Sequence, residues 1–267
     1  MNVSNRPSWF NRISIIVVMT FLYLPIAILI IFSFNKSKLV TVWGGFSTQW
    51  YASALSNAAL LDGARVSFMV AAVSATVATL LGLLAALVMV RMRRFRGRKL
   101  FMGLLAAPMV MPEVVMGVSM LLMFVTLGIV RGPLTITLAH ATFTMCFAAV
   151  ILQSRLTELD PSLEEAARDL GCPPATAFLK VALPNILPAL ISAWLLSFTL
   201  SLDDLVISSF TTGPGASTLP MKIYSQIKFG VTPEINAVST MILGIVAFGL
   251  LIVAVTTRRS DQGVPGH

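Results

Sequence analysis

Long apolar runs alternate with short polar segments along almost the whole chain. A helix that crosses a bilayer needs about 20 predominantly apolar residues. We predict six spans, at about 13–34, 64–90, 100–127, 134–153, 185–208 and 236–257. These runs lack the residue-by-residue alternation of a transmembrane barrel. The pattern therefore predicts an all-α membrane protein, with residues 1–267 forming one transmembrane domain.

Composition agrees with this class. Hydrophobic residues make up 57% of the chain and charged residues only 11%, whereas a soluble domain carries about 25% charged residues. The first run is too long for the apolar region of a signal peptide, and no small-residue cleavage site follows it. We therefore expect this run to remain as a membrane anchor.

The net charge of +8 is concentrated at one place, because six of the nine residues from Arg91 to Lys99 are basic. A basic loop directly after an apolar span is typical of the cytoplasmic side. With both termini inside, 13 Lys and Arg residues, Arg6 among them, lie in the cytoplasm and 6 lie outside. Contact with anionic lipid explains the basic loop, so no nucleic-acid partner is expected. The charge pattern thus predicts a multi-pass membrane protein with both termini in the cytoplasm.

Several kinds of chemistry have no support in the sequence. It has no G-x4-G-K-[ST] phosphate loop, no metal-ligand spacing and no nucleophile elbow. Cys146 and Cys172 fall in a membrane span and in the cytoplasm, so no disulfide is expected. We predict a chain that is not an enzyme and holds no cofactor or metal of its own.

A polar segment at residues 160–184 separates the fourth and fifth runs. Asp160 can cap a helix that Pro161 begins, and Gly171 suits the position just past its end. An apolar stripe follows the helix period, and its members are Leu163, Ala166, Ala167 and Leu170. We predict a second short helix that carries Phe178 and Val181 and ends before Pro184.

Two interpretations of the first short helix are open. It can lie passively on the membrane, or it can bind a soluble protein. Interfacial helices usually carry Lys and Arg on the polar face. This helix instead carries Glu164, Glu165 and Asp169 against a single Arg168, which favours a protein partner of complementary charge.

The segment Glu165-Ala166-Ala167-x3-Gly171-x9-Val181-x-Leu183-Pro184 resembles the EAA motif of binding-protein-dependent ABC transporter permeases. Val181 stands where that family more often has Ile. The resemblance implies the type I, MetI-like permease fold, with a coupling helix that inserts into a cleft on a separate ATPase subunit. By resemblance, Glu165, Ala166, Ala167 and Gly171 form the ATPase-coupling set, to which we add the neighbouring acids Glu164 and Asp169.

Three further segments are similar to the polyamine permeases of this family, and their residues are 37–43, 201–206 and 233–237. The resemblance implies a subunit of an ATP-driven importer, with putrescine favoured over spermidine. It also implies a second homologous permease, a cytoplasmic ATPase dimer that binds ATP and Mg, and a periplasmic polyamine-binding protein.

Ionisable groups inside a membrane span are costly and point to function. Glu113, His140, Asp203 and Asp204 come from three spans and can share one depth in the outer leaflet. Pro108 and Pro112 are expected to break or kink the third span beside Glu113.

We predict a substrate pathway that contains Glu113, Asp203, Asp204 and Tyr224. One aspartate should face the pathway, and the other should face a neighbouring helix or the external surface. The alternative is that the acids pair within the bundle, for example Glu113 with His140. We favour a structural role for His140.

Three further alternatives stay open. Trp43, Phe46, Trp50 and Tyr51 form either an aromatic belt at the membrane surface or a docking surface for an external partner. A proton-coupled carrier would use Glu113 or Asp203 as its relay. An intramembrane enzyme or assembly factor would use Glu113 and His140 as an acid–base pair.

Overall fold

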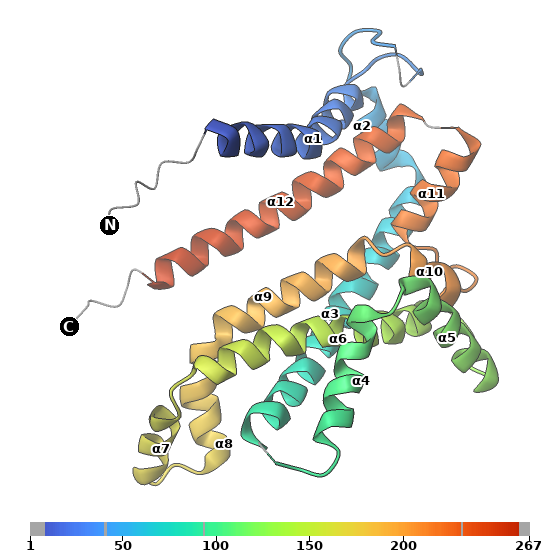
Figure 1. Cartoon of the computed structure of the whole chain (residues 1–267). Helices are drawn as coiled ribbons and strands as arrows, with labels where there is room; N and C mark the ends of the chain where they lie inside the picture. Colours follow the sequence, from blue (N-terminus) through green and yellow to red (C-terminus); the bar gives the residue numbers. More distant parts are fainter. Residues whose placement is uncertain (1–8, 40–41, 93, 231, 262–267) are drawn as a thin grey trace. The chain divides into compact units, whose positions relative to one another are not determined.

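The computed structural model describes residues 9–39, 42–92, 94–230 and 232–261 (Figure 1). Arg6, Val40, Thr41 and Arg93, which the sequence arguments used, lie outside these residues. The described elements are helices, apart from an isolated antiparallel bridge between Asn35 and Phe46. They are α1 (Trp9–Ser33), α2 (Gln49–Ser56), α3 (Ala58–Arg91), α4 (Arg98–Val110), α5 (Glu113–Thr126), α6 (Pro133–Glu158), α7 (Pro161–Asp169), α8 (Pro174–Ala177), the π-helical turn η1 (Phe178–Ala182), α9 (Leu183–Leu202), α10 (Val206–Thr211), α11 (Leu219–Phe229) and α12 (Pro233–Asp261).

Four described helices are long and apolar enough to cross a membrane: α1, α3, α6 and the continuous helix Pro174–Leu202. The bent pair α4–α5 adds a fifth if it forms one span, and α12 is apolar from Pro233 to Gly249. The prediction of an all-α, multi-pass membrane protein is confirmed. The count of six spans stays a prediction.

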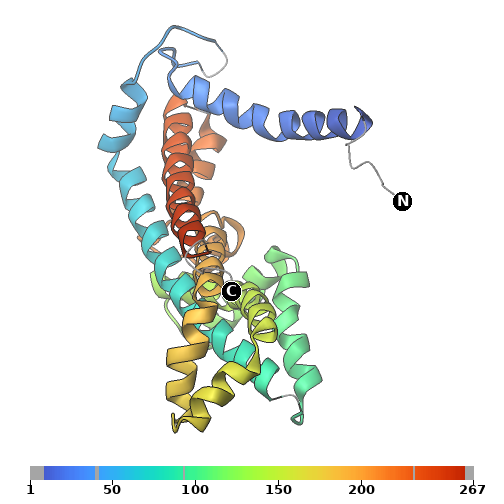
Figure 2. The same cartoon turned by 90° about the vertical axis from the view of Figure 1, so that its left-hand side faces the viewer.

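The chain divides into two compact units, each described here by itself. Unit 1 comprises residues 1–61 and 223–267. Within it, α12 packs against α1 and α2, and the carboxylate of Glu234 accepts hydrogen bonds from Ser53 Oγ (3.1 Å) and Asn57 Nδ2 (3.3 Å). The most apolar window of α1 has no buried residue, and both views show α1 diverging from α12 (Figures 1 and 2). Lipid or another protein must therefore cover most of α1.

The loop after α1 is organised by Asn35, whose side chain is fully buried. Its Oδ1 accepts hydrogen bonds from the backbone of Ser37 and Gly44, and its Nδ2 donates to the carbonyl of Val42. Trp50 Nε1 donates to the Asn35 carbonyl at 2.6 Å. Trp43 and Phe46 of the predicted aromatic cluster lie in this loop and remain exposed, whereas Trp50 and Tyr51 lie in α2.

Unit 2 comprises residues 62–222 and is built around the packed pair α6 and α9 (Figure 1). Small residues allow α3 to approach α6 closely, since a Cβ at Gly82 would lie 2.9 Å from Ala148 Cβ. Close packing of small residues is a principal attraction between helices in lipid. The core cluster at this contact consists of Leu83, Ala86, Ala148, Leu152, Leu156, Ile186 and Ala193.

The predicted break in the third span is confirmed. The axes of α4 and α5 differ by 113°, and the break lies at residues 111–112 (Figure 2). Pro112 ends the helix because it has no N–H to donate, whereas Pro108 lies inside α4 without interrupting it. The bend lets α5 pack against α10, where a Cβ at Gly117 would collide with Phe210.

The predicted end of the second short helix is wrong, whereas the limits of the fifth span in the membrane stay a prediction. The second short helix does not end before Pro184 but continues as one helix from Pro174 to Leu202. In η1 the N–H of Leu183 bonds to the carbonyl of Phe178, and this wider π-type turn precedes Pro184, which lacks an N–H. At the other end, Asp203 and Asp204 separate α9 from α10.

We expect residues 97 and 215 to lie on opposite sides of the membrane, with residue 97 inside. Both are glycines with positive φ, so their exposed neighbours Arg96 and Pro214 are the better labelling sites. In a Cys172→Ser background, which removes the half-exposed native thiol, an impermeant thiol reagent applied to intact cells should label Pro214→Cys and not Arg96→Cys. Labelling in the reverse order would overturn the orientation.

Candidate functional site

The first short helix is α7, and its ends form as predicted. The Asp160 side chain accepts a hydrogen bond from Ser162 N at 2.9 Å, and this bond lowers the pKa of Asp160. At the other end, Gly171 adopts φ +87°. Cys172 N bonds to Ala167 O and Gly171 N to Arg168 O, the pairing of a Schellman motif. Residues 160 and 171 thus act as the start and stop of α7.

One face of α7 is open to solvent. Leu163 is 44% exposed and Leu170 is 87% exposed, and Glu165, Ala166 and Asp169 are exposed beside them. The predicted apolar stripe therefore does not pack inward, apart from the half-buried Ala167. An apolar strip flanked by carboxylates is left free for another molecule.

Glu164 points elsewhere. Its carboxylate forms an ion pair with Arg91, the last residue of α3, and its side chain is only 15% exposed. Of the six residues predicted to couple to an ATPase, Glu164 is thus turned toward its own chain.

Asp203 and Asp204 lie at the break between α9 and α10. The Asp204 side chain accepts hydrogen bonds from Ile207 N (3.2 Å) and Ser208 N (2.7 Å) at the start of α10. Aspartate competes in this way with regular helix hydrogen bonding. The break therefore has a local cause that lies in the side chain of Asp204.

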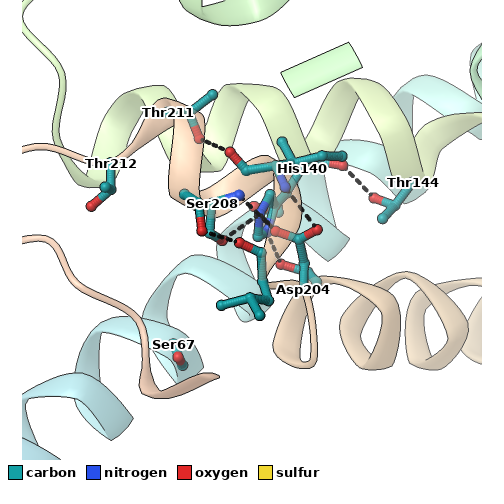
Figure 3. Close-up of polar contacts among 12 residues, drawn as sticks. Ser67, His140, Thr144, Asp204, Ser208, Thr211 and Thr212 are labelled. Atoms are coloured by element: carbon teal, nitrogen blue, oxygen red, sulfur yellow. Dashed lines mark hydrogen bonds and ion pairs between the residues drawn. The ribbon is translucent and has the colours of Figure 1, made fainter. Parts of the chain in front are cut away.

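His140 of α6 holds this break in place (Figure 3). The side chain is 1% exposed, and both ring nitrogens have partners. Nδ1 lies 2.7 Å from Ser201 Oγ, while Nε2 lies 3.1 Å from Asp204 Oδ2 and 3.0 Å from Ser208 Oγ. One imidazole thus joins the last turn of α9 to the first turn of α10.

Asp203 and Glu113 are placed differently from Asp204. Both residues are exposed. The alternative that pairs Glu113 with His140 is wrong, because the ring of His140 bonds to residues of α9 and α10 instead. The same geometry contradicts the acid–base pair of the enzyme hypothesis.

Tyr224 of α11 belongs to unit 1 and is 48% exposed. The ammonium of Lys228, one turn later on the same helix, lies 4.7 Å from the centroid of its ring. A cation–π contact of this kind already satisfies one face of the ring.

Sequence reasoning missed Ser201 and Ser208 as partners of His140, and Arg91 as the partner of Glu164. Ser201 and Ser208 lie three residues before and four residues after Asp204, on either side of the break between α9 and α10. Among the described residues, no group of three or more His, Cys, Asp or Glu side chains is placed to hold a metal ion.

Comparison with known proteins decides the family. The family model of binding-protein-dependent transport system inner membrane components matches residues 78–264. This chain belongs to that family.

Among the permease's relatives, the putrescine transport system permease protein PotI of Escherichia coli K12 is 53% identical over 90% of this chain and 88% of its own length. The spermidine/putrescine transport system permease protein PotC of the same strain is 42% identical over 93% of this chain and 94% of its own. The fold matches a chain of a bacterial ABC transporter involved in the import of alginate, with a TM-score of 0.70 at 15% identity over 94% and 93% of the two chains. The MetI-like fold that the EAA motif implied is confirmed.

We expect His140→Leu to destabilise this permease by about 3 kcal/mol, because it removes a hydrogen-bond partner from the buried carboxylate of Asp204. The double variant His140→Leu/Asp204→Asn should be more stable than His140→Leu alone, because asparagine keeps an oxygen for the N–H groups of α10 but carries no charge. Thermal unfolding in detergent measures both.

Thr142→Ala, an exposed change on the same helix, serves as the control for this measurement. A double variant that unfolds as early as His140→Leu would show that the Asp204 charge is not what makes His140 necessary.

Proposed function

We propose that this chain is an inner-membrane permease subunit of an ATP-driven ABC importer for polyamines, with putrescine as the substrate. The observation that carries the proposal is the exposed face of α7, within the EAA-like segment of a chain 53% identical to PotI. A second, homologous permease would complete the pathway. A cytoplasmic ATPase dimer would supply the energy, and a periplasmic binding protein would deliver the polyamine.

The exposed face of α7 suits a cleft on the ATPase. Ala166 leaves a shallow surface that permits close approach, while Leu163 and Leu170 supply apolar area on either side. Glu165 and Asp169 add charge that a basic rim on the partner would complement. The Schellman motif at Gly171 would keep the end of α7 rigid when the ATPase displaces this helix.

The exposed carboxylates Asp203 and Glu113 suit a diamine cation. A carboxylate attracts an ammonium group, and a diamine carries one at each end. Asp204 would have a structural role, because His140 and the N–H groups of α10 already occupy its oxygens. Directional transport further requires that the cation be held less tightly in the inward-facing state.

Spermidine is the second candidate substrate, since PotC is 42% identical over nearly its full length. Competition assays with the two polyamines in reconstituted vesicles would separate them. Putrescine as the preferred substrate predicts that spermidine competes weakly. Equal competition would favour transport of both spermidine and putrescine, the two polyamines in the name of PotC.

Glu165→Lys, Ala166→Trp and Gly171→Asp should abolish ATP-dependent uptake while membrane insertion stays intact. The first reverses a charge on the docking face, the second fills the shallow surface, and the third places a side chain at a left-handed backbone position. Putrescine uptake into vesicles and recovery of the ATPase with the tagged permease are the measurements.

Glu158→Lys is the matched control, because it makes the same charge change at an exposed residue before α7. Normal uptake in Glu165→Lys and Ala166→Trp would remove the coupling assignment.

Asp203→Asn should raise the putrescine concentration for half-maximal uptake about tenfold, which corresponds to about 1.4 kcal/mol of binding free energy. Asp203→Glu, which retains the charge, should raise it less. Asp204→Asn should mainly lower the amount of folded permease. If Asp203→Asn leaves the concentration dependence unchanged, Asp203 does not contact the cation.

A further inference from the structure

Arg91, the last residue of α3, contacts two elements of the cytoplasmic end at once. Its guanidinium pairs with the carboxylate of Glu164 on α7, and its Cζ lies 5.3 Å from the centroid of the Phe178 ring. Phe178 is the first residue of η1 and packs against the core cluster that contains Leu156 and Ile186. We name Arg91, Glu164 and Phe178 the Arg91 clamp.

The clamp joins elements that the backbone does not join directly. The chain connects α7 to α6 through residues 159–160 and to α8 through residues 170–173. The end of α3 lies far from α7 in the sequence, so contacts between side chains must carry any movement of α7 to α3. The ion pair is one such contact, and it joins the first turn of α7 to the last turn of α3.

The exposure of the pair fits a link that moves with α7. Arg91 is 44% exposed and Glu164 only 15%, so Glu164 is the more fixed partner. Charge pairs that face solvent contribute little to folding. Loss of the clamp should therefore leave the permease folded and change only how α3 follows α7.

We infer that Arg91 is a positioning residue that couples the displacement of α7 to α3 through Glu164 and Phe178. This inference rests on the proposed function, because it assumes that an ATPase displaces α7. It also gives Glu164 a role inside the chain, in place of direct contact with the ATPase.

The test uses the complete transporter in proteoliposomes with its ATPase and binding protein, and it measures ATP hydrolysis and putrescine uptake together. Arg91→Gln and Glu164→Gln should each lower the uptake per ATP hydrolysed about fivefold or more, with hydrolysis retained. The charge exchange Arg91→Glu/Glu164→Arg should restore at least half of the lost ratio. Arg94→Gln, which removes one positive charge from the same loop, should leave the ratio unchanged.

The inference is overturned if the exchange variant is no better than the single variants, or if hydrolysis and uptake fall in parallel. A wild-type complex that hydrolyses ATP but takes up no polyamine would instead refute the proposed function. In that case ATP hydrolysis alone tests the clamp. The single variants should change the stimulation of ATP hydrolysis by the binding protein, and the exchange variant should restore that stimulation. Stimulation equal to wild type in all three variants would then overturn the clamp.

Discussion

The hydrogen bonds of the buried His140 imidazole are the interaction on which the α9–α10 end of unit 2 depends. A helix inside a bilayer satisfies its own backbone, and a break in that helix exposes groups that lipid cannot satisfy. Here the Asp204 side chain satisfies two N–H groups at the start of α10, and His140 compensates the charge of that carboxylate. The arrangement lets the chain stop one helix and start another without leaving polar atoms alone in an apolar medium. The exposed position of Asp203 is a consequence of this break, because the neighbouring Asp204 already bonds to His140 and to the N–H groups of α10.

The two ends of unit 2 are connected by continuous helix. The helix Pro174–Leu202 has 29 residues, or about 43 Å at about 1.5 Å per residue. It begins beside α7 and ends at Asp203, and along its length it packs against α6, which carries His140. A packed pair of helices moves more readily as a body than by bending. A displacement at α7 can therefore reach the break without any change of secondary structure between them.

Features governed by local chemistry were predictable from the sequence. Asp160, Pro161 and Gly171 act within a few residues of themselves, so the limits of α7 followed from side chains and backbone preferences alone. The break at Pro112 followed for the same reason. The break after Leu202 could not be predicted in this way. Asp203 and Asp204 lie inside an apolar run, and no residue near them in the sequence shows which carboxylate will form a hydrogen bond with the distant His140. Leu163 and Leu170 illustrate the same limit. Their periodicity predicted a stripe, but only the packing of α7 shows that the stripe faces outward.

The contrast between Asp203 and Asp204 shows how a fold assigns different roles to identical side chains. Adjacent residues near a helix end point in different directions, so only one of the two can face α6. The one that does so acquires a histidine and two N–H donors and loses its capacity to bind a mobile cation. The other, Asp203, remains exposed. A cation site in a membrane protein needs a carboxylate whose charge is not already compensated. It also needs a neighbouring residue with a compensated charge, which keeps the helix ends from rearranging around the site. Under the proposed function, consecutive residues of this permease would meet the two requirements, so a change at either one should affect transport for a different physical reason.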